Sequence, residues 1–240
     1  MRRRFFVDRF DANRALVRGE TAEHLGRVLR AKPGQLYELS DGREVWLGKT
    51  ETVGKSGIEF SLVERIASHE PALAIVLWLA IVKFDRFEWA IEKGTELGVN
   101  TIVPLAAARS ERALVAAAEK RSTRWQKILR ESAQQARRLR SPELHAVARP
   151  AEAFAGDRSA LRILLSEREG APALRDVLGR GRSENAASAA VAVGPEGGWT
   201  DAEFDAARAA GLREASLGEN ILRTETAVCA ALASIRFALG

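Results

Sequence analysis

The chain has 240 residues, of which 46% are hydrophobic and 29% are charged. This composition is typical of a globular protein with a sizeable core, arranged as one large domain or two smaller ones. The single cysteine, Cys229, excludes a disulfide framework within the chain. No stretch resembles a signal peptide or a membrane span, so we expect a cytoplasmic protein with a buried, inert thiol.

The charge balance favours a polyanionic partner. The formal net charge is +5 and the sequence pI is about 9.8. The arginines are also clustered, and clustered arginines are typical of proteins that neutralise phosphates. The clusters are Arg2, Arg3 and Arg4, then Arg27 with Arg30, then the run from Arg121 to Arg130, then Arg137, Arg138 and Arg140. An RNA or DNA partner is therefore favoured.

The N-terminal part has the pattern of a small β-barrel. Its apolar residues alternate in short runs separated by turn signals. The predicted strands cover residues 4–7, 15–18, 35–39, 45–49 and 58–63, and one short helix is expected at 22–29. The segment 67–71, which ends at Pro71, predicts a domain boundary, with domains at 1–68 and 72–240.

After Pro71 the pattern changes to strands that alternate with helices, which predicts an α/β domain with a parallel sheet. Residues 73–82 form a continuous apolar run, as expected of a strand buried on both faces. Further strands are predicted at 101–105, 161–165, 189–193 and 214–217, and helices at 86–97, 119–138 and 224–239.

Two glycine-bearing loops are the most informative feature of the chain. Residues 193–204 read VGPEGGWTDAEF and residues 217–227 read LGENILRTETA. The first loop follows a strand-like run, and Thr200 with Glu203 predicts a capping box for the next helix. Glycine lets main-chain groups approach a ligand closely. The pair therefore indicates a ligand site at the ends of neighbouring strands, where open α/β sheets place their sites.

Several familiar sites are missing from the sequence. It contains neither a Walker loop nor a GxGxxG loop after a strand. His24, His69 and His145 lie far apart without metal-ligand spacing, so we expect no metal. A serine triad on a nucleophile elbow is excluded because no GxSxG motif is present.

The residues in these loops closely resemble the knotted SPOUT methyltransferases, and most of all the bacterial 16S rRNA (uracil-N3)-methyltransferase family. The resemblance rests on residues 194–198 (GPEGG), Leu217-Gly218 and residues 221–227 (ILRTETA). It extends to residues 24–30 (HLGRVLR) and to Lys83, Asp85, Arg86 and Ser110-Glu111-Arg112. It therefore covers nearly the whole chain.

The resemblance implies a fold and a cofactor. The fold would be a SPOUT domain with a C-terminal trefoil knot, preceded by a PUA-like β-barrel that binds RNA. The cofactor would be S-adenosylmethionine, held by three loops. The residues implied to bind it are Leu165, Ser166, Glu167, Gly194, Pro195, Glu196, Gly197, Gly198, Leu217, Gly218, Ile221, Leu222, Arg223 and Ala227.

The implied reaction is methylation of N3 of a uridine in the 16S rRNA of the small ribosomal subunit. Such a site needs a base for the N3 proton and a cation for the charge that develops on O2 and O4. Glu196 and Glu225 are candidate bases, and Arg223 and Arg109 are candidate stabilisers; Glu225 capping the last helix is an equal alternative. The candidate RNA-binding residues are Arg2, Arg3, Arg4, His24, Arg27, Arg30, Lys83, Arg86, Arg138 and Arg140.

Two other functions stay open. Related knotted families methylate ribose 2′-O, and a non-catalytic rRNA-binding assembly factor is an alternative outside the enzymes. We also expect a homodimer, because the helix at 224–239 is apolar nearly all round and must be buried on several sides.

Overall fold

The computed structural model describes residues 3–19, 22, 26, 30–54, 57–68 and 71–240. The chain divides into two compact units. One contains residues 1–70 and 130–141, and the other contains residues 71–129 and 142–240. Each unit is described by itself. None of the described helices is long and apolar enough to cross a membrane.

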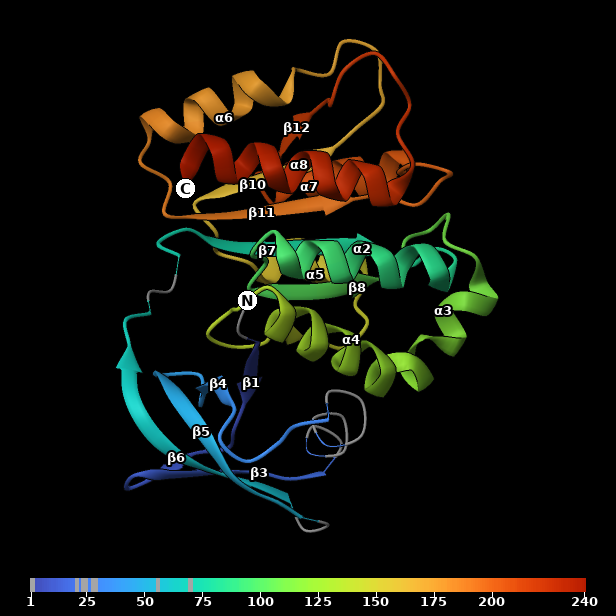
Figure 1. The fold of residues 1–240 in the computed structure, drawn as a ribbon. Coiled ribbons are helices and arrows are strands. Elements are labelled where there is room, and N and C mark those ends of the chain that lie inside the picture. The colour runs from blue at the N-terminus through green and yellow to red at the C-terminus, as the bar shows by residue number, and fades with distance from the viewer. Residues whose placement is uncertain (1–2, 20–21, 23–25, 27–29, 55–56, 69–70) are drawn as a thin grey trace. The chain divides into compact units, whose positions relative to one another are not determined.

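The first unit is built on a six-stranded sheet in the order β1-β4-β5-β6-β3-β2. β1 pairs with β4 in parallel and the other pairs are antiparallel. The long strands β5 and β6 curve (Figure 1), and β5 carries register shifts at Leu47/Gly48 and Thr50/Thr52. The strands are β1 Arg4–Phe6, β2 Phe10–Asp11, β3 Arg14–Val17, β4 Leu36–Ser40, β5 Val45–Gly54 and β6 Gly57–Ile66. Each strand predicted in this region is therefore present.

The core of this unit comes from the inward-facing positions of the strands. Alternation puts one side chain in two toward the core, and the buried set includes Phe5, Val17, Leu39, Ile58 and Phe60. The helix predicted at 22–29 falls mostly outside the described residues.

Residues 130–141 complete the first unit through hydrogen bonds to β1 and β4. Gln134 Oε1 accepts a bond of 3.2 Å from the Phe6 amide. The Ser40 hydroxyl donates to the Leu139 carbonyl at 2.6 Å. These contacts place the end of the arginine-rich segment beside the N-terminal strands.

The second unit has a six-stranded sheet in the order β12-β10-β11-β7-β8-β9, and every pair in it is parallel. Its strands are β7 Ala74–Ala80, β8 Thr101–Leu105, β9 Glu143–Leu144, β10 Leu161–Leu165, β11 Ser188–Val193 and β12 Arg213–Ala215. Its helices are α2 Phe84–Glu96, α3 Arg112–Ala118, the 3-10 turn η2 Glu119–Arg121, α4 Ser122–Gln135, α5 Pro150–Gly156, α6 Leu174–Ser183, α7 Asp201–Ala209 and α8 Thr224–Leu239. The last residues of α4, from 130 on, belong to the first unit. The predicted parallel sheet is thus confirmed.

Helices cover both faces of this sheet (Figure 1). Alternate residues of β7 enter different cores: Leu77 and Leu79 pack with α2, α6 and α8, whereas Trp78 and Ala80 pack with α5 and α7. Burial on both faces explains the unbroken apolar run in the sequence.

The predicted helix 119–138 is shorter in the structure. It begins as the 3-10 turn and ends at Gln135. Arg137 has φ of 55°, and the Arg138 amide donates back to the Ala133 carbonyl at 2.9 Å. A left-handed residue with this back-bond terminates a helix.

Candidate functional site

Three loops follow neighbouring parallel strands and enclose a cavity. β10 ends at Leu165, β11 at Val193 and β12 at Ala215, so the loops after them meet at the carboxyl edge of the sheet. They line a cavity of about 630 Å³, a size that suits a small-molecule ligand. Ligand sites in open parallel sheets lie at this edge.

The sequence-predicted cofactor residues all line this cavity. They are Leu165, Ser166, Glu167, Gly194, Pro195, Glu196, Gly197, Gly198, Leu217, Gly218, Ile221, Leu222, Arg223 and Ala227. Segments far apart in the sequence are therefore brought together as predicted. Their contact with a cofactor stays a prediction.

The glycines of the two loops serve different purposes. Gly218 has φ of +124°, and a Cβ built there would meet nothing within 4 Å, so its lack of a side chain leaves space beside the backbone. A Cβ on Gly194 would lie 3.0 Å from the Trp199 ring. Gly194 is therefore favoured by packing within the loop. That Gly218 lets a ligand approach the main chain stays a prediction.

Side chains tie the loop after β11 to its neighbours. The Trp199 indole nitrogen donates to the Leu165 carbonyl at 2.9 Å. The Thr224 hydroxyl donates to the Gly194 carbonyl at 3.3 Å. The predicted capping box at α7 is confirmed, since the Thr200 amide donates to Glu203 Oε2 at 2.8 Å and the Glu203 amide to Thr200 Oγ1 at 3.4 Å.

Arg109 contacts this loop through its guanidinium. Its Nη1 donates to the Gly197 carbonyl at 2.7 Å and to the Trp199 carbonyl at 3.3 Å. The amide of the preceding residue, Ala108, donates to Glu203 at 2.8 Å. Arg109 lines the cavity, but its charge is directed at main-chain carbonyls.

Glu196, in the same loop, pairs with Arg86 of α2. Arg86 Nη1 and Glu196 Oε1 are 2.8 Å apart, and their side chains are 28% and 46% exposed. The Arg86 guanidinium is thus engaged by a carboxylate of the same chain. That Arg86 binds RNA stays a prediction. Lys83, at the start of α2, is exposed.

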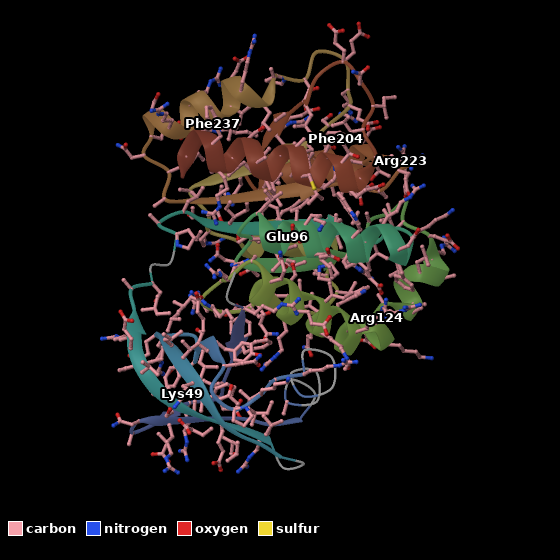
Figure 2. All side chains as sticks on the ribbon, in the orientation of Figure 1. Lys49, Glu96, Arg124, Phe204, Arg223 and Phe237 are labelled. Atoms are coloured by element: carbon pink, nitrogen blue, oxygen red, sulfur yellow. The ribbon has the colours of Figure 1, made fainter. Side chains whose placement is uncertain are left out.

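Arg223 and Glu225 differ in their relation to the cavity. Arg223 lies at the start of α8 (Figure 2), is exposed and lines the cavity. Glu225 is not among the lining residues, and its Oε2 is buried without a hydrogen-bond partner in the described part of the chain. This placement does not support Glu225 as the base.

The sequence did not predict the wall formed by Arg168, Asp201 and Phe204. All three line the cavity. The Arg168 guanidinium lies 3.5 Å from the Phe204 ring centroid and also pairs with Asp201. In the sequence, the one sign of a role for Arg168 is its position just after β10. Its partners lie in α7, more than thirty residues later, so no local pattern joins them to Arg168.

The burial of Arg4 does not support the prediction that it binds RNA. It is only 8% exposed, and its guanidinium donates to Glu38 Oε2 at 2.9 Å and to the Arg137 carbonyl at 2.6 Å. A strand residue that faces inward pairs within the protein rather than with phosphate. Arg3, Arg30 and Arg140 are exposed and Arg138 is half-buried; Arg2, His24 and Arg27 fall outside the described residues.

Cys229 is half-buried on α8. Burial raises the pKa of its thiol, with smaller effects from Lys93, Glu96 and Glu225. The thiolate is the nucleophile, so a raised pKa makes this thiol less reactive. Among the residues that the structure describes, no group of three or more His, Cys, Asp or Glu could hold a metal ion.

Comparisons with known proteins show which family the chain belongs to. The family model of an RNA methyltransferase domain matches residues 69–236. Ribosomal RNA small subunit methyltransferase E from Synechocystis sp. is 35% identical over 88% of this chain and 69% of its own length. The Bacillus subtilis protein of the same name is 30% identical over 92% of this chain and 89% of its own.

The solved structure of ribosomal RNA small subunit methyltransferase E from Neisseria gonorrhoeae, bound to S-adenosyl methionine, is 28% identical with a TM-score of 0.88. The match covers 99% of this chain and 98% of that one. The fold and the matched family model define the chain as an RNA methyltransferase. Within that class, it belongs to the family of ribosomal RNA small subunit methyltransferase E, so the resemblance seen in the sequence is confirmed.

Proposed function

We propose that this protein transfers a methyl group from S-adenosylmethionine to N3 of a uridine in 16S rRNA. One observation carries the proposal: the three-loop cavity at the carboxyl edge of the sheet gathers all the residues predicted to bind the cofactor. Family membership and a similar structure with S-adenosyl methionine bound support the same ligand.

The residues that line the cavity suit this cofactor chemically. Leu165, Leu217 and Leu222 offer apolar contacts for an adenine ring, and open space beside Gly218 lets main-chain groups meet its polar edge. Ile221 also lines the cavity but is 80% exposed in the single chain. A ligand or a second subunit would cover this side chain.

The reaction needs positioning and charge stabilisation more than covalent chemistry. The bound cofactor supplies a methyl group on a sulfonium, which makes that carbon electrophilic. Uracil N3 must lose its proton, to a carboxylate or to solvent water, before or during attack. Arg223 can stabilise the negative charge on O2 and O4. Arg109 is directed at Gly197 and Trp199, so Arg223 is the better candidate for this role.

The C-terminal path supports a knotted topology. β12 lies at the edge of the sheet beyond β10, yet α8 packs against α2, α6 and β11. The chain must therefore return across β10 after leaving β12, and segment 216–223 makes this return. We propose that this return is threaded, as in SPOUT folds.

The remaining parts of the proposal concern organisation. Residues 1–68 would form a PUA-like RNA-binding domain, and residues 72–240 a SPOUT domain. The active protein would be a cytoplasmic homodimer with α8 at its interface. A curled sheet with exposed arginines at Arg3 and Arg30 suits an RNA-binding role.

The test is methyl transfer to small ribosomal subunits that lack the modification, with labelled S-adenosylmethionine. Naked 16S rRNA serves as a second substrate, and nucleoside analysis by mass spectrometry identifies the product. We expect 3-methyluridine. A 2′-O-methylated nucleoside would instead assign ribose methylation, and RNA binding without S-adenosylmethionine binding would assign an assembly factor.

A further inference from the structure

The loop of residues 194–199 reaches the cavity but has little regular structure of its own. It contains the lining residues Gly194, Gly197 and Gly198, and Gly198 has φ of +68°. Its internal hydrogen bonds include the Gly198 amide to the Pro195 carbonyl at 2.8 Å. A glycine-rich segment loses much conformational entropy when ordered, so outside contacts must hold its shape.

Two arginines from other elements supply such contacts. Arg86, in the first turn of α2, pairs with Glu196 at 2.8 Å. Arg109, after β8, donates to the Gly197 and Trp199 carbonyls at 2.7 and 3.3 Å. Arg86 and Arg109 therefore hold the loop around Gly197 and Gly198, although each is more than 80 residues away from its partner in sequence.

Gly197 allows this close contact because it has no side chain. A Cβ at Gly197 would lie 3.2 Å from Arg109 Cβ and 3.4 Å from Arg109 Cδ. The absence of a side chain thus lets the stem of Arg109 pass close along the loop. The buried carboxylate of Glu203 accepts hydrogen bonds from the Ala108 amide at 2.8 Å and from the Thr200 amide. These bonds fix the segment that carries Arg109.

We propose that Arg86 and Arg109 are positioning residues that clamp the 194–199 loop in the shape that binds the cofactor, and that Glu196 serves as the anchor for Arg86. This inference rests on the proposed function only for the identity of the ligand. It gives Glu196 a role other than the base, because the Arg86 guanidinium occupies one of its carboxylate oxygens at 2.8 Å.

The pair is tested by a double-mutant cycle of Arg86→Ala, Glu196→Ala and the double variant, with calorimetric S-adenosylmethionine binding. The pair is partly exposed, so each single change should raise Kd about two- to five-fold. The double variant should be no worse than the poorer single. The reversed pair Arg86→Glu with Glu196→Arg should recover most of the affinity. Asp205→Ala with Arg208→Ala removes an exposed pair on α7 and should leave Kd unchanged.

Arg109 is tested in the same assay. Arg109→Ala removes two charge-assisted bonds to carbonyls and should raise Kd about ten-fold. Arg109→Lys keeps one donor charge and should recover part of the loss. Additive effects in the Arg86–Glu196 cycle, or an unchanged Kd in all these variants, would overturn the clamp. So would a Glu196→Ala variant that loses turnover at unchanged Kd and is not rescued by the reversed pair, because Glu196 would then act directly.

Hydrogen exchange on the ligand-free protein separates the clamp from the ligand assignment. In Arg86→Ala and Arg109→Ala the amides of Gly197, Gly198 and Trp199 should exchange faster than in the wild type. A wild-type protein that binds no S-adenosylmethionine would overturn the proposed function alone. Unchanged exchange at these three amides would overturn the clamp alone.

Discussion

The indole nitrogen of Trp199 donates a hydrogen bond of 2.9 Å to the carbonyl oxygen of Leu165. This bond joins the end of β10 to the loop after β11, so it links two of the three segments that enclose the cavity. The same ring lies directly against Gly194, where a Cβ would come within 3.0 Å. One buried side chain thus sets the spacing between neighbouring loops.

Trp199→Phe should keep most of the apolar packing and remove the hydrogen bond to the Leu165 carbonyl. We expect a loss of about 1–2 kcal/mol in the free energy of unfolding, measured by denaturant titration, with weaker S-adenosylmethionine binding. Trp46→Phe is the matched control, because its Nε1 has no hydrogen-bond partner in the described part of the chain. Equal losses in the two variants would show that the Trp199 bond contributes nothing specific.

Gly218→Val should abolish cofactor binding while the fold survives. The new side chain meets no protein atom near its Cβ position, so its bulk would enter the space beside the cavity. Gly170→Val is the control: it has φ of +80° and an equally open Cβ position, but it does not line the cavity. Both variants carry similar backbone strain. Calorimetry that finds undiminished affinity in folded Gly218→Val would refute this part of the site.

Arg223→Ala should reduce turnover far more than cofactor affinity. If its charge acts on the developing uracil anion, kcat should fall about a hundred-fold while the Kd for S-adenosylmethionine stays within a factor of about two. Arg223→Lys should recover part of kcat. Single-turnover methyl transfer and calorimetry measure the two quantities, and parallel losses would make Arg223 a binding residue instead.

Local sequence patterns were sufficient for much of the second unit. The predicted ranges Thr101–Leu105, Leu161–Leu165 and Thr224–Leu239 coincide with β8, β10 and α8. Each consists mostly of apolar residues and is flanked by loop residues, so the signal lies within the element itself. The Thr200 capping box was likewise visible because its residues are three apart.

What the sequence could not supply depends on contacts between distant segments. Arg4 looked like part of a basic cluster, yet strand geometry turns it inward onto Glu38. Arg86 matched a family motif, but its partner Glu196 lies 110 residues away. Arg168 and Phe204 gave no joint signal at all. The family resemblance located the loops, whereas the role of each arginine around them depended on the tertiary structure.

Arg4 and the arginines of segment 130–141 should therefore behave differently. Arg4→Ala removes one of two guanidinium partners of the buried Glu38 carboxylate, the other being Arg137 at 3.3 Å, and should cost about 1.5–3 kcal/mol of stability. Arg14→Ala, at an exposed position on β3, should cost less than about 0.5 kcal/mol. Thermal and denaturant unfolding measure both. A stable Arg4→Ala variant would contradict the structural role.

Arg138→Ala with Arg140→Ala should instead change the salt dependence of RNA binding. Each phosphate contact that is lost should reduce the slope of log K against log salt by about one. Binding to small ribosomal subunits at several salt concentrations gives this slope. If the slope stays at the wild-type value, the RNA surface lies elsewhere.

The homodimer can be tested on α8. Val228, Ala231, Leu232 and Ile235 are buried within the second unit, while Phe237 is 94% exposed and projects from the same helix near its end (Figure 2). The helix is thus apolar on a side that its own domain leaves uncovered, and exposed aromatic residues are enriched at protein interfaces.

We expect sedimentation equilibrium at micromolar concentration to give twice the chain mass of 26.2 kDa. Phe237→Glu should shift the protein toward monomer and weaken cofactor binding, because Ile221 and its loop would lose their cover. Val63→Glu introduces the same charge at another exposed apolar residue, in the first unit, and should leave the mass unchanged. A wild-type protein that sediments as a single 26.2 kDa species and is fully active at that concentration would rule out a site shared between subunits.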